Sequence, residues 1–94
     1  MRIYYISILE QYYQESTNLF SKDLVTASQS NGRFYLNKKR AIKTAKSIFK
    51  QLSEKEVYQK DYEKFIKNEE EGQFSLKTIG GNFLAVHVNE LTDM

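Results

Sequence analysis

The first hydrophobic segment of the chain, Ile3–Tyr13, carries apolar residues at both odd and even positions. Successive side chains of a strand point to opposite faces, so Ile6 and Ile8 would share one face. Tyr5 and Leu9 would then share the other. Apolar groups on both faces are typical of a strand in the interior of a sheet. The segment is therefore predicted to be a central strand, or one covered by protein on one face and by aromatic rings on the other.

A second, weaker strand signal lies at Leu24–Ala27. Asn31 and Gly32 follow it, and these residue types supply the two positive φ angles that a type I′ turn requires. Arg33 and the apolar run Phe34-Tyr35-Leu36 come next. We therefore expect a turn at Asn31-Gly32 that leads into a short third strand, Arg33–Leu36.

The clearest periodic pattern in the chain predicts an amphipathic helix that begins after Asn37, a good N-cap residue. The apolar residues of this segment recur at the spacing of a single helical stripe. They are Ala41, Ile42, Ala45, Ile48, Phe49 and Leu52.

A second helix is predicted from Glu54 onward, because Ser53-Glu54-Lys55-Glu56 has the form of a capping box. The Glu69–Glu71 run and Gly72 would end this helix. Its apolar stripe would be narrower than that of the first helix, and would consist of Val57, Tyr58, Tyr62, Phe65 and Ile66.

The last third of the chain predicts a hairpin around Gly80 and Gly81. A two-residue loop would pair Lys77 with Leu84 and would mix polar and apolar groups on each face. A three-residue loop, Gly80-Gly81-Asn82, gives one fully apolar face instead, so we prefer that register. Its cross-strand pairs would be Thr78–Leu84, Leu76–Val86 and Phe74–Val88.

These elements predict a single α+β domain of two layers that spans residues 1–94. An antiparallel sheet of about four to five strands would carry one long basic amphipathic helix and a second helix. The chain has no proline and no low-complexity run, so nothing suggests a linker. An exposed strand edge at Ile3–Tyr13 or Phe74–Ile79 would allow two copies to form a homodimer edge to edge.

The composition excludes several kinds of site. The 94 residues contain no cysteine and one histidine, which rules out disulfides, thiolate metal sites, a cysteine nucleophile and any site with two imidazoles. The chain lacks an apolar run of about 18 residues, and its strand-like beginning does not resemble a signal peptide. We expect a cytoplasmic protein that crosses no membrane, needs no metal or cofactor, and is not an enzyme.

Positive charge is concentrated in one segment. Seven basic and no acidic residues lie between residues 33 and 52, although the net charge of the chain is only +2. Within the first predicted helix, four lysines would span about 60° of the circumference, opposite the apolar stripe. They are Lys39, Lys43, Lys46 and Lys50. Such a line can follow phosphates or an acidic protein surface, or it can be a solvated outer face.

Lys38, Lys39 and Arg40 would occupy the first turn of that helix, where the helix dipole disfavours cations by about 0.3–1 kcal/mol each. Free backbone N–H groups and three cations together make a reasonable anion site. A Lys-rich composition, screened by salt, is the alternative explanation. This placement of charge against local preference is the strongest functional indication in the chain.

Aromatic residues make up 14% of the chain, as seven tyrosines and six phenylalanines, and several occur in adjacent pairs such as Tyr12-Tyr13. In a strand, one ring of each pair would enter the core and the other would not. Exposed tyrosines are common at protein interfaces and can also stack on single-stranded bases. Ordinary packing within the sheet is the alternative for each ring.

An N-terminal strand, a helix that starts Asn37-Lys38-Lys39-Arg40, and a closing Val86-His87-Val88-Asn89 strand together resemble small accessory proteins of phages and mobile elements. This resemblance implies a non-enzymatic protein that binds and inhibits or redirects a host machine, as anti-CRISPR proteins do. Many such inhibitors are strongly acidic and mimic DNA. This chain is mildly basic, so mimicry of a duplex is not expected.

We therefore expect a small intracellular protein, encoded by a phage or mobile element, that binds a host protein or a protein–nucleic acid complex. The alternative is a nucleic-acid-binding protein that uses the same lysines, which would show in the salt dependence of its affinity. The candidate binding residues are Lys38, Lys39, Arg40, Lys43, Lys46, Lys50, Tyr12 and Tyr13.

Overall fold

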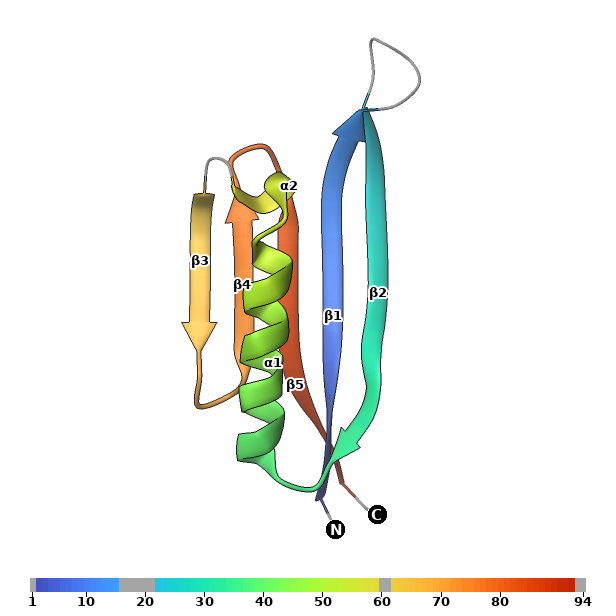
Figure 1. The fold of residues 1–94 in the computed structure, drawn as a ribbon, viewed down its shortest axis with the longest axis vertical. Coiled ribbons are helices and arrows are strands. Elements are labelled where there is room, and N and C mark those ends of the chain that lie inside the picture. Colours follow the sequence, from blue (N-terminus) through green and yellow to red (C-terminus); the bar gives the residue numbers. More distant parts are fainter. Residues whose placement is uncertain (1, 16–21, 60–61, 93–94) are drawn as a thin grey trace.

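The computed structural model describes residues 2–15, 22–59 and 62–92. Five strands form one antiparallel sheet in the order β2-β1-β5-β4-β3, and both helices lie on the same face of it (Figure 1). This arrangement confirms the α+β class. In chain order the elements are β1 (Arg2–Glu15), β2 (Lys22–Tyr35), α1 (Lys38–Ser53), α2 (Glu56–Gln59), β3 (Tyr62–Asn68), β4 (Gln73–Thr78) and β5 (Phe83–Thr92).

The hydrophobic core lies between α1 and the middle of the sheet. Even-numbered residues of β1, β4 and β5 point toward α1, as the alternation of a strand requires. The helix meets them with Ala41, Ala45 and Phe49, all of which are buried. The Phe49 ring lies 5.9 Å from the Phe74 ring. The sheet side of the core consists of Ile6, Ile8, Phe74, Leu76, Leu84 and Val86.

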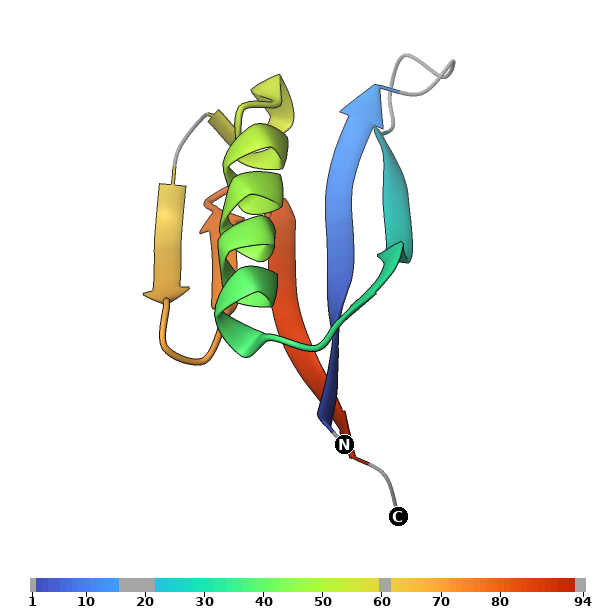
Figure 2. The same ribbon diagram turned by 60° about the horizontal axis from the view of Figure 1, so that its bottom comes forward.

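The molecule is elongated, with principal extents of 52 × 22 × 19 Å. The β1–β2 hairpin runs beside α1 and extends past its end (Figure 1), while α1 lies over β4 and β5 in both views (Figure 2). Within residues 2–15, 22–59 and 62–92, no helix lies on the face of the sheet opposite α1, which is called the open face below. None of the helices in the described part of the chain is long and apolar enough to cross a membrane.

The prediction for β1 is confirmed, since this strand lies between β2 and β5, with Ile6 and Ile8 buried under α1. The predicted strand edges are wrong. Neither β1 nor β4 is at an edge, because β2 and β3 flank the sheet.

The predicted start of the first helix after Asn37 is also confirmed, since the Asn37 side chain accepts a hydrogen bond from the Arg40 backbone N–H at 3.2 Å. The helix is shorter than expected, with 16 residues.

The predicted turn at Asn31-Gly32 is wrong, because β2 continues through it as one strand of 14 residues. The pairing with β1 shifts there instead, as in a β-bulge, and Gly32 has a φ of 75°. Side-chain oxygens accept hydrogen bonds from two backbone N–H groups at the bulge. The Gly32 N–H donates to Ser30 Oγ, and the Arg33 N–H donates to Asn31 Oδ1. The positive φ of Gly32 is thus part of a β-bulge, not of a hairpin turn.

The predicted second helix is mostly wrong. Ser53 ends α1 and donates its hydroxyl to the Lys50 carbonyl, so it does not cap a new helix. The helix that follows, α2, has four residues, and Tyr62–Asn68 forms strand β3 against β4. The aromatic and β-branched residues of this segment favour a strand once a partner strand is available.

The terminal hairpin has a three-residue loop, as predicted, but the loop residues are Ile79-Gly80-Gly81. The Thr78 N–H donates to the Asn82 carbonyl, and Gly81 has a φ of 92° and donates to the Thr78 carbonyl. This geometry is a type I turn followed by a bulge residue. The register is therefore shifted by two from the predicted one, with Leu76 opposite Leu84, while the same side chains share the apolar face.

Candidate functional site

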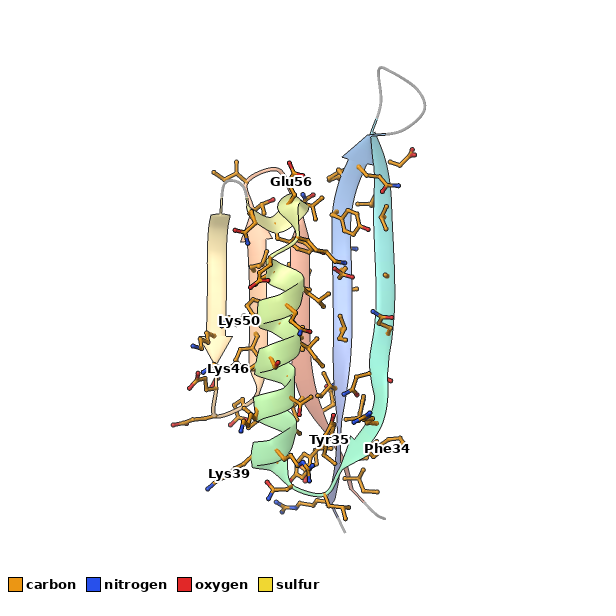
Figure 3. All side chains as sticks on the ribbon, in the orientation of Figure 1. Phe34, Tyr35, Lys39, Lys46, Lys50 and Glu56 are labelled. Atoms are coloured by element: carbon orange, nitrogen blue, oxygen red, sulfur yellow. The ribbon has the colours of Figure 1, made fainter. Side chains whose placement is uncertain are left out.

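Helix α1 turns its small residues toward the sheet and carries its lysines outside this contact. Ala41 and Ala45 are fully buried and let the helix axis approach β5 closely. Figure 3 shows Lys39, Lys46 and Lys50 along one flank of the helix, and Lys46 and Lys50 line a pocket there together with Lys67 and Phe74. We call the six cations of α1 the basic face; they are Lys38, Lys39, Arg40, Lys43, Lys46 and Lys50. No acidic residue occurs within α1.

The turn between β3 and β4 places two carboxylates against the basic face. Glu69 pairs with Lys46 at 2.5 Å and with Lys67 at 3.1 Å, while Glu71 lies 3.8 Å from Lys38. The hydrogen bond and charge of Glu69 raise the pKa of Lys46. Hydrogen bonds from Lys46 and Lys67, followed by their charges, lower the pKa of Glu69. Two of the six cations of the basic face are therefore already paired within the molecule.

The other four cations of the basic face are Lys39, Arg40, Lys43 and Lys50, and they are exposed. Their side chains form no ion pair with any residue that the structure describes. Eleven residues separate Lys39 from Lys50, which corresponds to about 16 Å along the helix axis. The basic face thus presents a row of free cations that is interrupted near its middle by the Lys46–Glu69 pair.

The two candidate tyrosines lie on opposite faces of the sheet. The Tyr12 ring packs edge-on against Tyr58 on the α1 side, with ring centres 6.1 Å apart and an angle of 85°. Tyr13 is 43% exposed, and its backbone N–H donates to Asn82 Oδ1. The predicted division of adjacent rings between core and surface is confirmed for this pair. Tyr13 lies on the opposite side of the sheet from the basic face, so the structure does not join them into one surface.

The same division holds at Phe34 and Tyr35, which point to opposite sides of β2 (Figure 3). Tyr35 packs against the core, and its hydroxyl accepts a hydrogen bond from the Asn31 side chain at 2.8 Å. Phe34 is 69% exposed on the open face and stands directly across from Tyr5. The strand alternation could have identified Phe34 from the sequence, but only with the strand's pairing known.

The open face has a hollow at the β2 bulge and a trough at its centre, neither of which the sequence analysis identified. The hollow is lined by Tyr5, Ser30, Gly32, Arg33, Phe34 and Leu91. The trough is lined by Ser7, Ile8, Leu9, Ser28, Phe83, Ala85 and His87. Its lining alternates small and larger residues: Leu9 is opposite Ser28 and Ala85, and His87 is opposite Ser7.

A buried polar cluster joins α2 to β1. Glu10 is 5% exposed, and its carboxylate accepts hydrogen bonds from the Tyr58 hydroxyl at 3.0 Å and from Lys55 Nζ at 2.9 Å. Burial of the phenol, followed by the charge of Glu10, raises the pKa of Tyr58 well above its ordinary value. Both donors bind the same carboxylate oxygen, Oε1, and they tie α2 to β1.

Comparisons with family models, curated proteins and solved structures find no match to this chain. Within the described residues, no group of three or more histidine, cysteine, aspartate or glutamate side chains is placed to hold a metal ion. The basic face and the open face are therefore the candidate functional surfaces.

Proposed function

We propose that the protein is a non-enzymatic binding protein that docks onto an acidic surface of a partner protein through its basic face. The observation that carries this proposal is the charge of α1: six cations, no acidic residue, and four cations without an ion pair among the described residues. Cations that are not needed for internal pairing are available to steer and orient an acidic partner.

The carboxylates beside the basic face favour a protein over a nucleic acid as the partner. Glu69 and Glu71 lie against Lys46 and Lys38, where a continuous line of phosphates would meet their negative charge. A protein surface can place single carboxylates opposite Lys39, Lys43 and Lys50 and avoid the interruption. Discrete charge pairs of this kind set the register of an interface.

The partner that we propose is a component of a host machine, and the outcome of binding is inhibition or redirection of that machine inside the cell. The support for this part is the resemblance of the chain to small accessory proteins of phages and mobile elements. Occupation of a site on another protein requires only a stable fold and a complementary surface, and a 94-residue chain can provide both.

The experiment is affinity capture from bacterial lysate, with and without nuclease, using the wild type and two variants. Lys39→Gln/Lys43→Gln removes two cations from the basic face. Thr26→Glu/Ser28→Glu changes the net charge equally but alters exposed positions of β2 on the open face. We expect one dominant protein that survives nuclease, is lost with the first variant and is retained with the second. Equal capture by both variants would contradict the role of the basic face.

A second candidate function is nucleic-acid binding through the same residues, and the observation that favours it is the cluster Lys38–Arg40 at the N-terminus of α1. Four phosphate contacts would give a slope of log K against log salt of about −3.6 for duplex DNA and about −2.8 for a single strand. Capture that disappears with nuclease, together with such a slope, would favour this function. A flat salt dependence would exclude it.

A further inference from the structure

A pocket of about 190 Å³ lies between the second half of α1 and the strands β3 and β4. Four of its described lining residues come from α1, at the i, i+3, i+4 and i+7 spacing of one helix flank, and two come from the strands. They are Lys46, Phe49, Lys50, Ser53, Lys67 and Phe74. Figure 3 shows Lys46 and Lys50 on the same flank of α1. Both also belong to the basic face, so the pocket adjoins the proposed docking surface.

The surface of the pocket is predominantly apolar and includes two phenylalanine side chains. The ring centres of Phe49 and Phe74 are 5.9 Å apart, with an angle of 31° between the ring planes. Because these residues are only 5% and 1% exposed, the pocket opens onto the boundary of the core. An apolar side chain placed there would extend the core. Neither buried ring offers an open face on which a nucleotide base can stack.

Three lysines line the pocket beside this apolar surface, and two of them share a single carboxylate oxygen. Glu69 Oε1 lies 2.5 Å from Lys46 Nζ and 3.1 Å from Lys67 Nζ. Lys50 is exposed and forms no ion pair with any residue that the structure describes. Lys50 is therefore available to a carboxylate of a ligand that occupies the pocket.

We propose that this pocket receives an aromatic side chain from an acidic segment of the partner protein, while a carboxylate next to that ring pairs with Lys50. The inference rests on the proposed function, because it assigns the residue that anchors the partner beside the basic face. One aromatic side chain in a pocket, surrounded by weaker contacts, is a common source of affinity at protein interfaces. The lysines favour an aromatic ring over an aliphatic chain, since cations are attracted to the ring face.

The size of the pocket argues against a free small molecule as its occupant. A cavity of about 150 Å³ holds one benzene ring, so this pocket has room for one phenylalanine ring and little more. Sites for small-molecule ligands usually have volumes of about 300–1,000 Å³. A ring that belongs to a protein gains further contacts along the basic face, which a free aromatic acid does not.

The first test is fluorescence anisotropy with fluorescein-labelled, amidated peptides that differ at their central residue: Asp-Glu-Phe-Glu-Asp, Asp-Glu-Leu-Glu-Asp and Asp-Glu-Ala-Glu-Asp. We expect the phenylalanine peptide to bind about 5- to 30-fold more tightly than the alanine peptide, as for an interface anchor of moderate strength. Ser53→Leu puts an apolar side chain into the pocket and should remove this preference. Ser47→Leu makes the same change at an exposed position of α1 outside the pocket lining and should keep it. Circular dichroism checks that both variants are folded.

Lys50→Gln tests the proposed ion pair. It should weaken binding of the phenylalanine peptide by about 2- to 5-fold, as expected for a solvent-exposed charge pair, and high salt should reduce this effect. An amidated neutral peptide, Gln-Gln-Phe-Gln-Gln, is the control. It should bind the wild type and Lys50→Gln equally, because it has no carboxylate to pair with Lys50.

Chemical-shift mapping on the wild type gives a measurement that does not depend on the folding of a variant. Addition of the phenylalanine peptide, compared with the alanine peptide, should shift the backbone amide signals of Lys50, Ser53 and Phe74. The signals of Tyr5 and His87, which lie on the open face, should not change.

The outcomes separate this inference from the proposed function. Equal binding of the phenylalanine and alanine peptides, with both weakened by Lys39→Gln/Lys43→Gln, would keep the basic face as the docking surface and overturn the aromatic anchor. Absence of binding by every peptide at about 1 mM protein would overturn the anchor and contradict the proposed function as well. A leucine peptide that binds as tightly as the phenylalanine peptide would overturn the assignment to an aromatic ring. A preference that Ser47→Leu and Ser53→Leu change equally, or shifts confined to the open face, would exclude the pocket.

Discussion

The hydroxyl of Tyr58 and the carboxylate of Glu10 are joined by a hydrogen bond of 3.0 Å between two buried side chains that are 48 residues apart. Lys55 donates to the same carboxylate oxygen at 2.9 Å. The four-residue helix α2 is too short to be stable alone. Its contact with β1 therefore determines where the chain turns from α1 toward β3.

Replacement of Tyr58 by phenylalanine should lower the free energy of unfolding by about 1.5–3 kcal/mol, because a buried charge loses one of its two donors. Tyr13→Phe is the matched control, since the Tyr13 ring is exposed and should change stability by less than about 0.5 kcal/mol. Urea unfolding followed by circular dichroism measures both. If the two variants were equally stable, the Tyr58–Glu10 bond would have no structural role.

The pairing of Lys46 with Glu69 predicts a pH dependence of stability. The pKa of Glu69 is lowered in the folded protein, so its contribution is present above the ordinary value of 4.5 and is lost as the pH falls through the folded pKa. The pKa of Lys46 is raised, so its contribution is complete below the ordinary value of 10.5 and is lost as the pH rises through the folded pKa.

Glu69→Gln should therefore lower the Tm at neutral pH, and the difference from the wild type should disappear in acid. Both side chains are half-exposed, so high salt should also reduce the difference. Glu70→Gln is the control, because Glu70 is exposed and forms no ion pair with a described residue. A difference that stays constant from acid to neutral pH would mean that Glu69 does not act through its charge.

Asn82 connects three parts of the fold through one side chain. Its Oδ1 accepts from the Tyr13 backbone N–H at 3.0 Å, and its Nδ2 donates to the Val57 carbonyl at 2.7 Å. Asn82→Ala should lower the free energy of unfolding by about 1–3 kcal/mol, as expected for two hydrogen bonds. Asn82→Asp keeps the acceptor for Tyr13 but places a negatively charged oxygen against the Val57 carbonyl, so its loss at neutral pH should be at least as large as that of Asn82→Ala. The Tm values of the wild type, Asn82→Ala and Asn82→Asp in thermal unfolding test this order. Variants as stable as the wild type would contradict it.

Local signals in the sequence were sufficient for α1 and for the faces of β1. The apolar stripe and the Asn37 cap depend on neighbours within one or two helical turns, and the alternation of Ile6 and Ile8 depends only on strand geometry. Both predictions were confirmed because no distant partner was needed to decide them. The three-residue loop of the last hairpin was predicted for the same reason.

Elements decided by distant contacts were not predictable from local patterns. Tyr62–Asn68 has an amphipathic spacing that suits a helix, and its pairing with β4 makes it a strand. An Asn31-Gly32 pair is compatible with a hairpin turn and with a bulge. The pairing of β2 with β1 on both sides of it makes it a bulge. The pairs of Lys38 with Glu71 and of Lys46 with Glu69 follow from the same β3–β4 pairing, so local patterns could not predict them.

Two glycines with positive φ offer the last prediction, because their surroundings differ. Gly72 has a φ of 68°, and a Cβ there would lie 2.7 Å from Val88 Cγ2 and 3.0 Å from Ile42 Cγ1. Gly32 has a φ of 75°, with nothing within 4 Å of the same position. Gly32→Ala should therefore cost only the left-handed backbone conformation, about 1–2 kcal/mol. Gly72→Ala should cost more, because it adds a clash of about 1–3 kcal/mol to the same backbone term. Equal losses in chemical denaturation would show that the turn after β3 moves away from Val88 and Ile42 at no cost.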